Sequence, residues 1–380
     1  MRREEVWSPG GKSGWQPVMT GGDTTVSTYW LNWRVLLCCL WILMSIVFAI
    51  VLITKYEGSR KGGSTSSGNR SSSVSSERRR RDDDDLCGQQ QGQGQGPGVL
   101  YEDEVWKTSL KNVHPAWLLA FRIFAFVLLL VMLILYAAAD GSSIFYFYTQ
   151  WTSTLLVIYF GLGSLLSMYG CYQYHNRVIS TETHHHHHHH QMMMMINNDG
   201  AGFYGSSPIS KHVPPPLSHH LEPAAANTKV AHFWGYIFQI IFQMNAGAVT
   251  LTDCVFWFVL VPYLTIKGYN LNFLIIGMHS INVVFLLVDT VLNCLRFPWF
   301  RIGYFFLWTA VYVIFQWALH ACISIWWPYP FLDLSSPFAP LWYSSVALMH
   351  IPCYGIFVLV VKLKHHLLSK WFPHSFQCST

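Results

Sequence analysis

The sequence predicts an all-α membrane protein, a polytopic bundle of about seven transmembrane helices. Of its 380 residues, 52% are hydrophobic and only 11% are charged, whereas soluble domains carry about 25% charged residues. Apolar stretches of about 20 residues recur along the chain, and a helix needs that length to cross a bilayer. The predicted spans cover residues 35–54, 116–138, 144–171, 233–264, 271–295, 304–326 and 341–361.

Each span follows from its own apolar run. The run at 35–54 starts too late and is too long for a signal peptide, so we assign it as a full span. The fourth run, 233–264, exceeds the length of an upright helix and is expected to tilt or to extend beyond the bilayer. The fifth run, 271–295, contains two groups that ionise, His279 and Asp289. Ionisable groups at such depth are costly and often functional.

Lysine and arginine lie mostly in alternate loops. They cluster near the helix ends in the loops after the first, third and fifth spans and in the C-terminal tail. The opposite side has few near its helix ends, among them Lys12, Arg34 and Lys267. The positive-inside rule then places the N-terminus outside or in a lumen and the C-terminus in the cytosol. Asn69-Arg70-Ser71 is a glycosylation sequon on the predicted cytosolic side, so a glycan on Asn69 would contradict this orientation.

The chain divides into membrane and loop segments. Long stretches rich in Ser, Gly, Gln, Arg and Asp cannot bury enough apolar surface to fold, which predicts disorder. We interpret His184–His190 as a homopolymer tract within such a loop and assign it no function. The predicted segments are a non-cytosolic 1–34, an additional first span 35–54, a disordered cytosolic loop 55–115, a six-span core 116–361 interrupted by a disordered loop 176–227, and a cytosolic tail 362–380.

Charge and cysteine content exclude several classes of protein. The formal charge of +5 fits loops that face anionic lipid and does not indicate nucleic-acid binding. The nine cysteines include no CxxC pair and lie mostly within spans. The sequence therefore predicts neither a disulfide framework nor a thiolate zinc site.

Polar residues within the spans recur at helical spacing, which predicts polar stripes that face the bundle interior. We interpret one set as interhelical hydrogen-bonding groups: Gln239, Gln243, Asn282 and Gln316. We expect Asp289 and Asn293 to be local helix-end or interhelical partners.

A second set of polar groups shares one depth in the outer half of the bilayer. At 1.5 Å of rise per residue, these groups lie between ~8 Å and ~16 Å below the outer ends of their spans. Their members are Thr149, Asp253, His279, His320 and His350.

Two chemistries fit that layer. A threonine hydroxyl becomes a nucleophile when a neighbouring histidine takes its proton, which Thr149 and His279 would provide. Alternatively, three histidines and a carboxylate are suitable ligands for zinc or iron. The residue spacing alone leaves both open.

Three short motifs resemble the androgen-induced protein and rolling stone group of multi-pass membrane proteins. In chain order they are Phe147-Tyr148-Thr149-Gln150-Trp151-Thr152, Gly277-Met278-His279-Ser280 and Tyr329-Pro330-Phe331-Leu332. Members of this family act as threonine hydrolases of fatty acid esters of hydroxy fatty acids. The resemblance covers about 116–361 and implies that Thr149 is the nucleophile and His279 the base. The first span and the two long loops have no counterpart in the animal hydrolases.

The resemblance implies a lipid ester substrate. His320, His350 and Asp253 of the same polar layer are candidate accessory residues, and we predict no cofactor or metal. Thr152, one turn after Thr149, is the competing nucleophile. Two other functions stay open: a non-enzymatic scaffold or adhesion and fusion protein, and a metal- or haem-binding protein that uses the three histidines. Membrane lipid is an expected partner, and the sequence does not predict protein partners.

Overall fold

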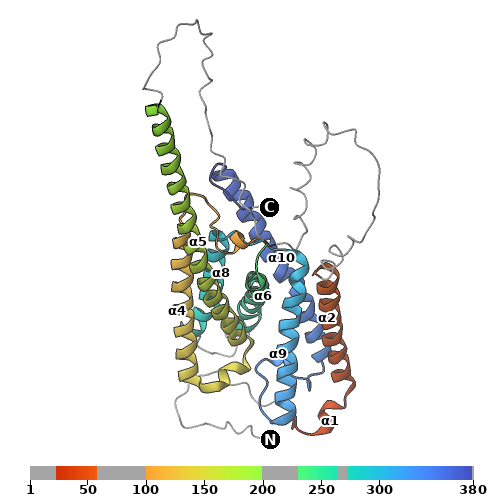
Figure 1. Ribbon diagram of the computed structural model, residues 1–380. Coiled ribbons are helices and arrows are strands. Elements are labelled where there is room, and N and C mark those ends of the chain that lie inside the picture. Colours follow the sequence, from red (N-terminus) through yellow and green to blue (C-terminus); the bar gives the residue numbers. More distant parts are fainter. Residues whose placement is uncertain (1–22, 58–99, 199–229, 263–272, 379–380) are drawn as a thin grey trace, which may run out of the picture.

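The fold is an all-α bundle, as the sequence predicts. The computed structural model describes residues 23–57, 100–198, 230–262 and 273–378 (Figure 1). The helices are α1 (Ser27–Trp30), α2 (Trp33–Glu57), α4 (Pro115–Asp140), α5 (Tyr148–Asn198), α6 (Phe233–Val255), α8 (Phe273–Leu292), α9 (Ile302–Cys322) and α10 (Ala339–Trp371). Short 3₁₀ segments are η2 (Glu102–Val105), η3 (Gly141–Tyr146), η5 (Trp299–Arg301) and η6 (Pro330–Leu332), and η4 (Phe256–Leu260) is a π-helical turn.

Six of the seven predicted spans correspond to helices long enough to cross a membrane. Within the described ranges, six helical stretches are long and apolar enough to cross a membrane: α2, α4, α5, α6 with η4, α9 with η5, and α10. The remaining span, 271–295, corresponds to α8, whose apolar part His279–Leu292 is shorter. The chain is therefore a multi-pass membrane protein.

The helices pack around two apolar cores. α4, α5, α6 and α8 enclose one core, which includes Phe160, Phe242 and Leu286. α2, α9 and α10 surround the other, which includes Phe305 and Tyr343. α6 contacts α5 as well as α9 and α10, and so connects the two cores. The first span, predicted to be additional to the core, packs along α9 in Figure 1 and forms part of the second core.

Local sequence signals set the ends of α4. Pro115 occupies its first turn, where a backbone N–H has no hydrogen-bond partner within the helix, so proline loses nothing by lacking one. The His114 side chain accepts a hydrogen bond from Ala116 N at 3.1 Å and so caps the helix. Gly141 ends it with a φ of +72°, a conformation that favours glycine.

α5 is longer than the predicted span 144–171. It runs to Asn198 and enters the segment 176–227 that the sequence assigns to a disordered loop. Figure 1 shows its C-terminal part projecting beyond the bundle. A hydropathy window detects the part of a helix that lies in lipid and not its polar extension, which explains the difference.

Residues 100–114, predicted as the end of a disordered loop, are folded against the bundle, whereas residues 58–99 lie outside the described ranges. Leu100 and Val105 belong to the first core. Trp106 packs on Gly170 of α5, where an added Cβ would lie 2.1 Å from the indole ring. The sequence did not predict this folded segment, because its few apolar residues directly follow a long polar loop whose composition predicts disorder.

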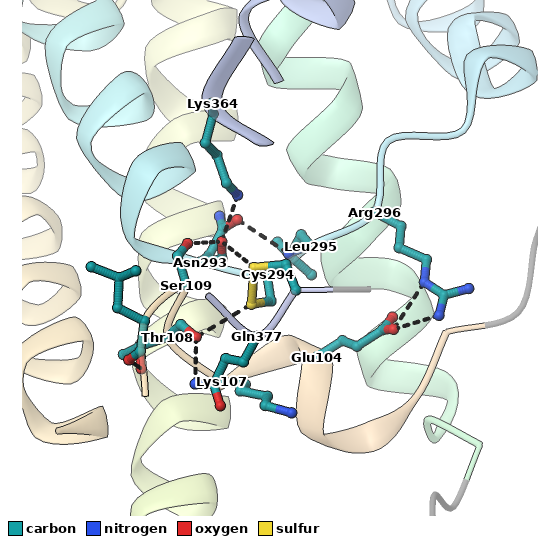
Figure 2. The surroundings of a disulfide bond; sticks show 12 residues. Glu104, Lys107, Thr108, Ser109, Asn293, Cys294, Leu295, Arg296, Lys364 and Gln377 are labelled. Atoms are coloured by element: carbon teal, nitrogen blue, oxygen red, sulfur yellow. Dashed lines mark hydrogen bonds and ion pairs between the residues drawn. A yellow bond between two sulfur atoms is a disulfide. The ribbon is translucent and has the colours of Figure 1, made fainter. Parts of the chain in front are cut away.

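A disulfide corrects the prediction that the cysteines form none. Cys294, just after α8, is bonded to Cys378 near the C-terminus, with Cα atoms 5.1 Å apart (Figure 2). Hydrogen bonds tie each disulfide segment to a further element: Lys364 Nζ of α10 donates to Asn293 O at 2.7 Å, and Gln377 N donates to Ser109 O, before α4, at 3.2 Å. The partners are 84 residues apart in sequence, so no local spacing indicates the pair.

Candidate active site

Thr149 and His279 line one partly open apolar cavity, where the empty space, including space open to the surroundings, is about 520 Å³. Thr149 lies in the first turn of α5 and His279 near the start of α8, so both are at the same end of the bundle. The other lining residues are Tyr148, Leu251, Thr252, Val255, Leu260, Thr309, Tyr312, Val313, Tyr329, Phe331, Leu332 and Val346.

Tyr329 anchors the start of α5 beside Thr149. Its phenol oxygen accepts a hydrogen bond from Tyr148 N at 3.1 Å and also bonds the Thr149 side chain. Burial raises the pKa of Tyr329, and the hydrogen bonds from Thr149 and Tyr148 offset part of that rise. Tyr329 is thus a neutral phenol whose O–H is a hydrogen-bond donor next to the candidate nucleophile.

His279 is held by two residues at the end of α6. Its Nδ1 lies 3.5 Å from Asp253 Oδ1, and its ring stacks on Phe256 with centroids 3.7 Å apart. Only 7% of the His279 surface is exposed. Phe256 is also the first residue of the π-helical turn η4, and π turns inside helices occur frequently at functional sites. Asp253 and Phe256 together fix how the imidazole is oriented.

The two other predicted histidines have separate environments. His350 Nε2 lies 2.8 Å from Thr309 Oγ1, and Thr309 lines the cavity. His320 stacks on Trp327 at 3.6 Å and its Nδ1 bonds Gln316 O, away from the cavity. The structure therefore brings Thr149, Asp253, His279 and His350 around one region and leaves His320 outside it.

The competing hydroxyls near Thr149 have other contacts. Thr152 donates to Tyr148 O at 3.1 Å and Thr154 to Gln150 O at 2.8 Å, each within α5. Ser153 accepts from Asn282 at 2.9 Å. Of these four hydroxyl residues of the first turns of α5, Thr149 is the one that lines the cavity.

A metal site has no geometric support in the part of the chain that the structure describes. No three His, Cys, Asp or Glu side chains come close enough there to hold one ion. His279 faces Asp253, His320 faces Trp327 and His350 faces Thr309, so the three histidines do not converge.

The polar stripes form hydrogen bonds. The bond between Asn282 and Ser153 joins two membrane helices as predicted, whereas the acceptors of the three glutamines lie in the loop after α8 and in η3. Gln239 and Gln243 both donate to Arg296 O, Asn282 donates to Ser153, and Gln316 donates to Tyr146 O. These contacts confirm the interpretation of the stripes as hydrogen-bonding groups.

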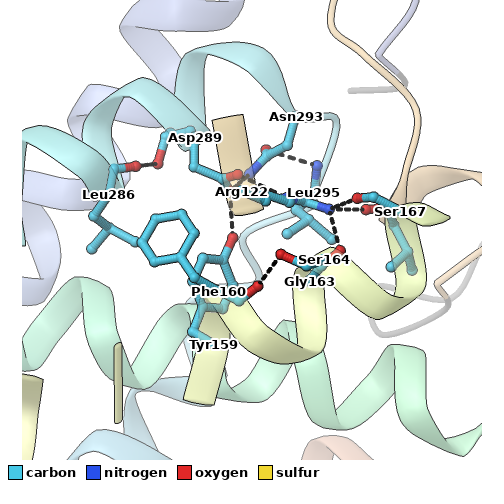
Figure 3. Close-up of polar contacts among 12 residues, drawn as sticks. Arg122, Tyr159, Phe160, Gly163, Ser164, Ser167, Leu286, Asp289, Asn293 and Leu295 are labelled. Carbon is cyan, nitrogen blue, oxygen red and sulfur yellow. Dashed lines mark hydrogen bonds and ion pairs between the residues drawn. The ribbon is translucent and has the colours of Figure 1, made fainter. Parts of the chain in front are cut away.

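A charged network at the opposite end of the bundle was only partly anticipated. Asp289 accepts from Arg122 Nε at 2.8 Å, from Asn293 Nδ2 at 2.8 Å and from the Tyr159 hydroxyl (Figure 3). Arg122 and Asp289 are both fully buried. Asp289 and Asn293 were expected to be local helix-end or interhelical partners. Arg122 was not identified, although it is a single charge in the apolar run 116–138.

The fold and the cavity define an all-α multi-pass membrane protein with a threonine and a histidine facing one apolar chamber. No protein-family model, no curated protein and no solved structure matches the chain. The resemblance to the androgen-induced protein and rolling stone group therefore rests on the three motifs and stays a prediction.

Proposed function

We propose that this protein is an intramembrane hydrolase of lipid esters, of the fatty acid ester of hydroxy fatty acid type, with Thr149 as nucleophile and His279 as general base. The observation that carries the proposal is the shared cavity: both side chains line it, and its other walls are mainly apolar. An apolar chamber with a few polar groups suits a lipid that carries one ester.

The neighbours of each residue fit these roles: the Thr149 hydroxyl bonds Tyr329, and His279 lies against Asp253. In the proposed reaction the Thr149 hydroxyl turns from Tyr329 to His279, which takes its proton as Oγ1 bonds to the ester carbonyl carbon, and Asp253 stabilises the imidazolium that forms. The alkoxide then leaves with the proton from His279, which yields acyl-Thr149 and an alcohol. Water hydrolyses the acyl-threonine with His279 again as base. Tyr329 O–H is the donor for the developing oxyanion.

We also propose that the N-terminus lies outside or in a lumen and the C-terminus in the cytosol, on the basis of the basic residues. The cavity is at the end of the bundle where α5 begins, so this orientation puts it toward the outer leaflet. A membrane lipid ester then reaches it with the carbonyl near the headgroup boundary.

The test is reaction of the purified full-length protein with a fluorophosphonate probe, with the modified residue located by peptide mass spectrometry. We expect an adduct on Thr149. Thr149→Ala removes it, and His279→Asn slows its formation by about 100-fold or more, the usual contribution of a general base. Thr250→Val is the control, because the Thr250 hydroxyl bonds Ala246 O within its own helix and lines no part of the cavity. Absence of a Thr149 adduct in the folded wild-type protein contradicts the proposal.

A further inference from the structure

A second threonine and histidine form a hydrogen-bonded pair in the wall of the cavity. Thr309 Oγ1 of α9 lies 2.8 Å from His350 Nε2 of α10. The two residues come from neighbouring helices and are 41 positions apart in sequence, so their contact depends on how α9 and α10 cross. A nucleophile and a base within hydrogen-bond reach are the geometric signature of an activated hydroxyl.

The contacts of His350 define its tautomer. Nδ1 lies 2.8 Å from the carbonyl oxygen of Val346, which can only accept, so Nδ1 carries the proton. In the neutral ring Nε2 is then the acceptor, and the Thr309 hydroxyl donates to it. The other acceptor near this hydroxyl, Phe305 O, is farther away at 3.3 Å. The imidazole thus has its lone pair directed at the Thr309 hydroxyl.

Two further contacts hold the pair in place. The His350 ring lies between Phe305 and Phe306, with centroid distances of 4.3 Å and 4.6 Å. Tyr148 Oη lies 2.9 Å from Thr309 Oγ1. Because Thr309 donates to His350, Tyr148 donates to Thr309. The resulting chain of hydrogen bonds runs from Tyr148 through Thr309 to His350 and ends at the Val346 carbonyl.

The pair lies between two cavities. A second, half-open cavity lies between α2, α9 and α10 and is lined by His350, Trp41, Ile42 and Trp342 among others. Its empty space, including space open to the surroundings, is about 490 Å³. Thr309 lines both cavities. The walls of the second cavity are mainly aliphatic and aromatic, and α2 supplies one side of it. A hydrocarbon chain fits this lining, with a polar group at the Thr309 end.

We propose that Thr309 is a second nucleophile of this protein, with His350 as its general base, and that it accepts the acyl group of a long-chain ester whose hydrocarbon chain lies in the second cavity. Thr309 Oγ1 bonds to the carbonyl carbon while its proton moves to His350 Nε2. The ester C–O bond breaks and the leaving alkoxide takes that proton, giving acyl-Thr309 and an alcohol. Water then hydrolyses the acyl-threonine. This pair does not depend on Thr149 or His279.

The test uses a fluorophosphonate with a long alkyl chain on the full-length protein in lipid nanodiscs, with adducts located by peptide mass spectrometry. In the Thr149→Ala/His279→Asn background we expect an adduct on Thr309. His350→Gln slows its formation by about 100-fold or more. In the same background, Ile42→Trp fills the second cavity and lowers the Thr309 adduct by about tenfold or more. Introduced into the wild-type protein, Ile42→Trp leaves the reaction at Thr149 unchanged, because Ile42 lines the second cavity and not the first.

Thr309→Ser is the folding control, since it retains the hydroxyl and its bond to His350 and should still react at position 309. Adducts on Thr149 alone, with this control variant folded, overturn the inference and leave the proposed function intact. Adducts on Thr309 alone support the inference and contradict the proposed function. Absence of both adducts from the folded protein overturns both.

Discussion

At the scale of single residues, the Arg122–Asp289 pair is the contact with the largest electrostatic consequence. Both side chains are fully buried, so each has given up its hydration. Asp289 regains three hydrogen bonds, from Arg122, Tyr159 and Asn293 (Figure 3). The same arginine donates to Ser167 Oγ at 2.6 Å and to Val105 O at 3.0 Å. The network therefore connects α4, α5 and α8 with the folded segment before α4.

Removing one partner of this pair should be far worse than removing both. We expect Arg122→Leu to destabilise the protein by about 3–5 kcal/mol, because it leaves Asp289 charged and uncompensated. Arg122→Leu with Asp289→Leu should recover most of that loss. Tyr159→Phe, which keeps the ring stacked on Phe238, should cost about 1–3 kcal/mol. Unfolding in detergent micelles measures all three, and an unchanged transition for Arg122→Leu would show that the pair is not stabilising.

The sequence predicted a candidate site residue only where a polar side chain interrupts an apolar run or belongs to a motif. His279 does so, because it interrupts an apolar run, and Thr149 was selected by a motif. Thr309 does not, since an ordinary helical threonine carries no signal until α10 places His350 2.8 Å from it. Asp289 was visible, but Arg122 lies 167 residues away and no local spacing relates the two.

At the scale of elements, α6 and α9 approach closely at a glycine. A Cβ added at Gly247 would lie 2.4 Å from the ring of Phe305 on α9. Small residues of this kind let membrane helices pack tightly. The same two helices carry Leu251 and Thr309, which line the first cavity. The close approach at Gly247 therefore positions two walls of the candidate active site.

We expect Gly247→Ala to lower stability by about 1–3 kcal/mol, as overpacking does. Phe305→Leu in the same protein should relieve the overlap and restore part of the loss. Gly355→Ala on α10 is the matched control: nothing lies within 4 Å of the added Cβ, so alanine should be neutral or up to about 1 kcal/mol stabilising. Thermal unfolding in detergent separates the cases, and equal behaviour of the two alanine variants would contradict the packing argument.

Helix positions were predictable and helix lengths were not. Hydropathy finds the spans because a bilayer demands about 20 apolar residues from every crossing helix. Outside the lipid no such demand exists, so the extension of α5 to Asn198 has no hydropathy signal. The folded segment 100–114 was likewise hidden, because its few apolar residues act only through contacts with distant helices.

At the scale of the whole molecule, segments that are far apart in the sequence meet at one face of the bundle, at the end opposite the start of α5. Arg301 bonds Glu57 at 2.7 Å, Arg296 bonds Glu104 at 2.8 Å, and Lys364 bonds Asn293 O at 2.7 Å. These contacts bring the end of α2, the segment before α4, the end of α8 and α10 together. The basic residues that predict the orientation therefore lie on the same face as the disulfide in Figure 2.

This shared location provides a decisive test of orientation, because the basic residues indicate that this face is cytosolic, whereas the disulfide indicates that it is not. Basic residues mark the cytosolic face, whereas disulfides persist in oxidising compartments and cytosolic thiols stay reduced. Under the proposed orientation, Cys294 and Cys378 are free thiols in intact cells and form the bond of the structure only after oxidation. Only a membrane-permeant maleimide should modify them, and Asn69 should carry no glycan.

The measurement is alkylation of intact cells with permeant and impermeant maleimides, followed by non-reducing mass spectrometry of the tail peptide. Cys378→Ser is the matched control, because it leaves Cys294 as a single thiol that cannot pair with the tail. A Cys294–Cys378 bond recovered from freshly alkylated cells, or a glycan on Asn69, would reverse the orientation and place this face outside. The candidate active site would then open toward the cytosolic leaflet, since α5 begins at the opposite end of the bundle.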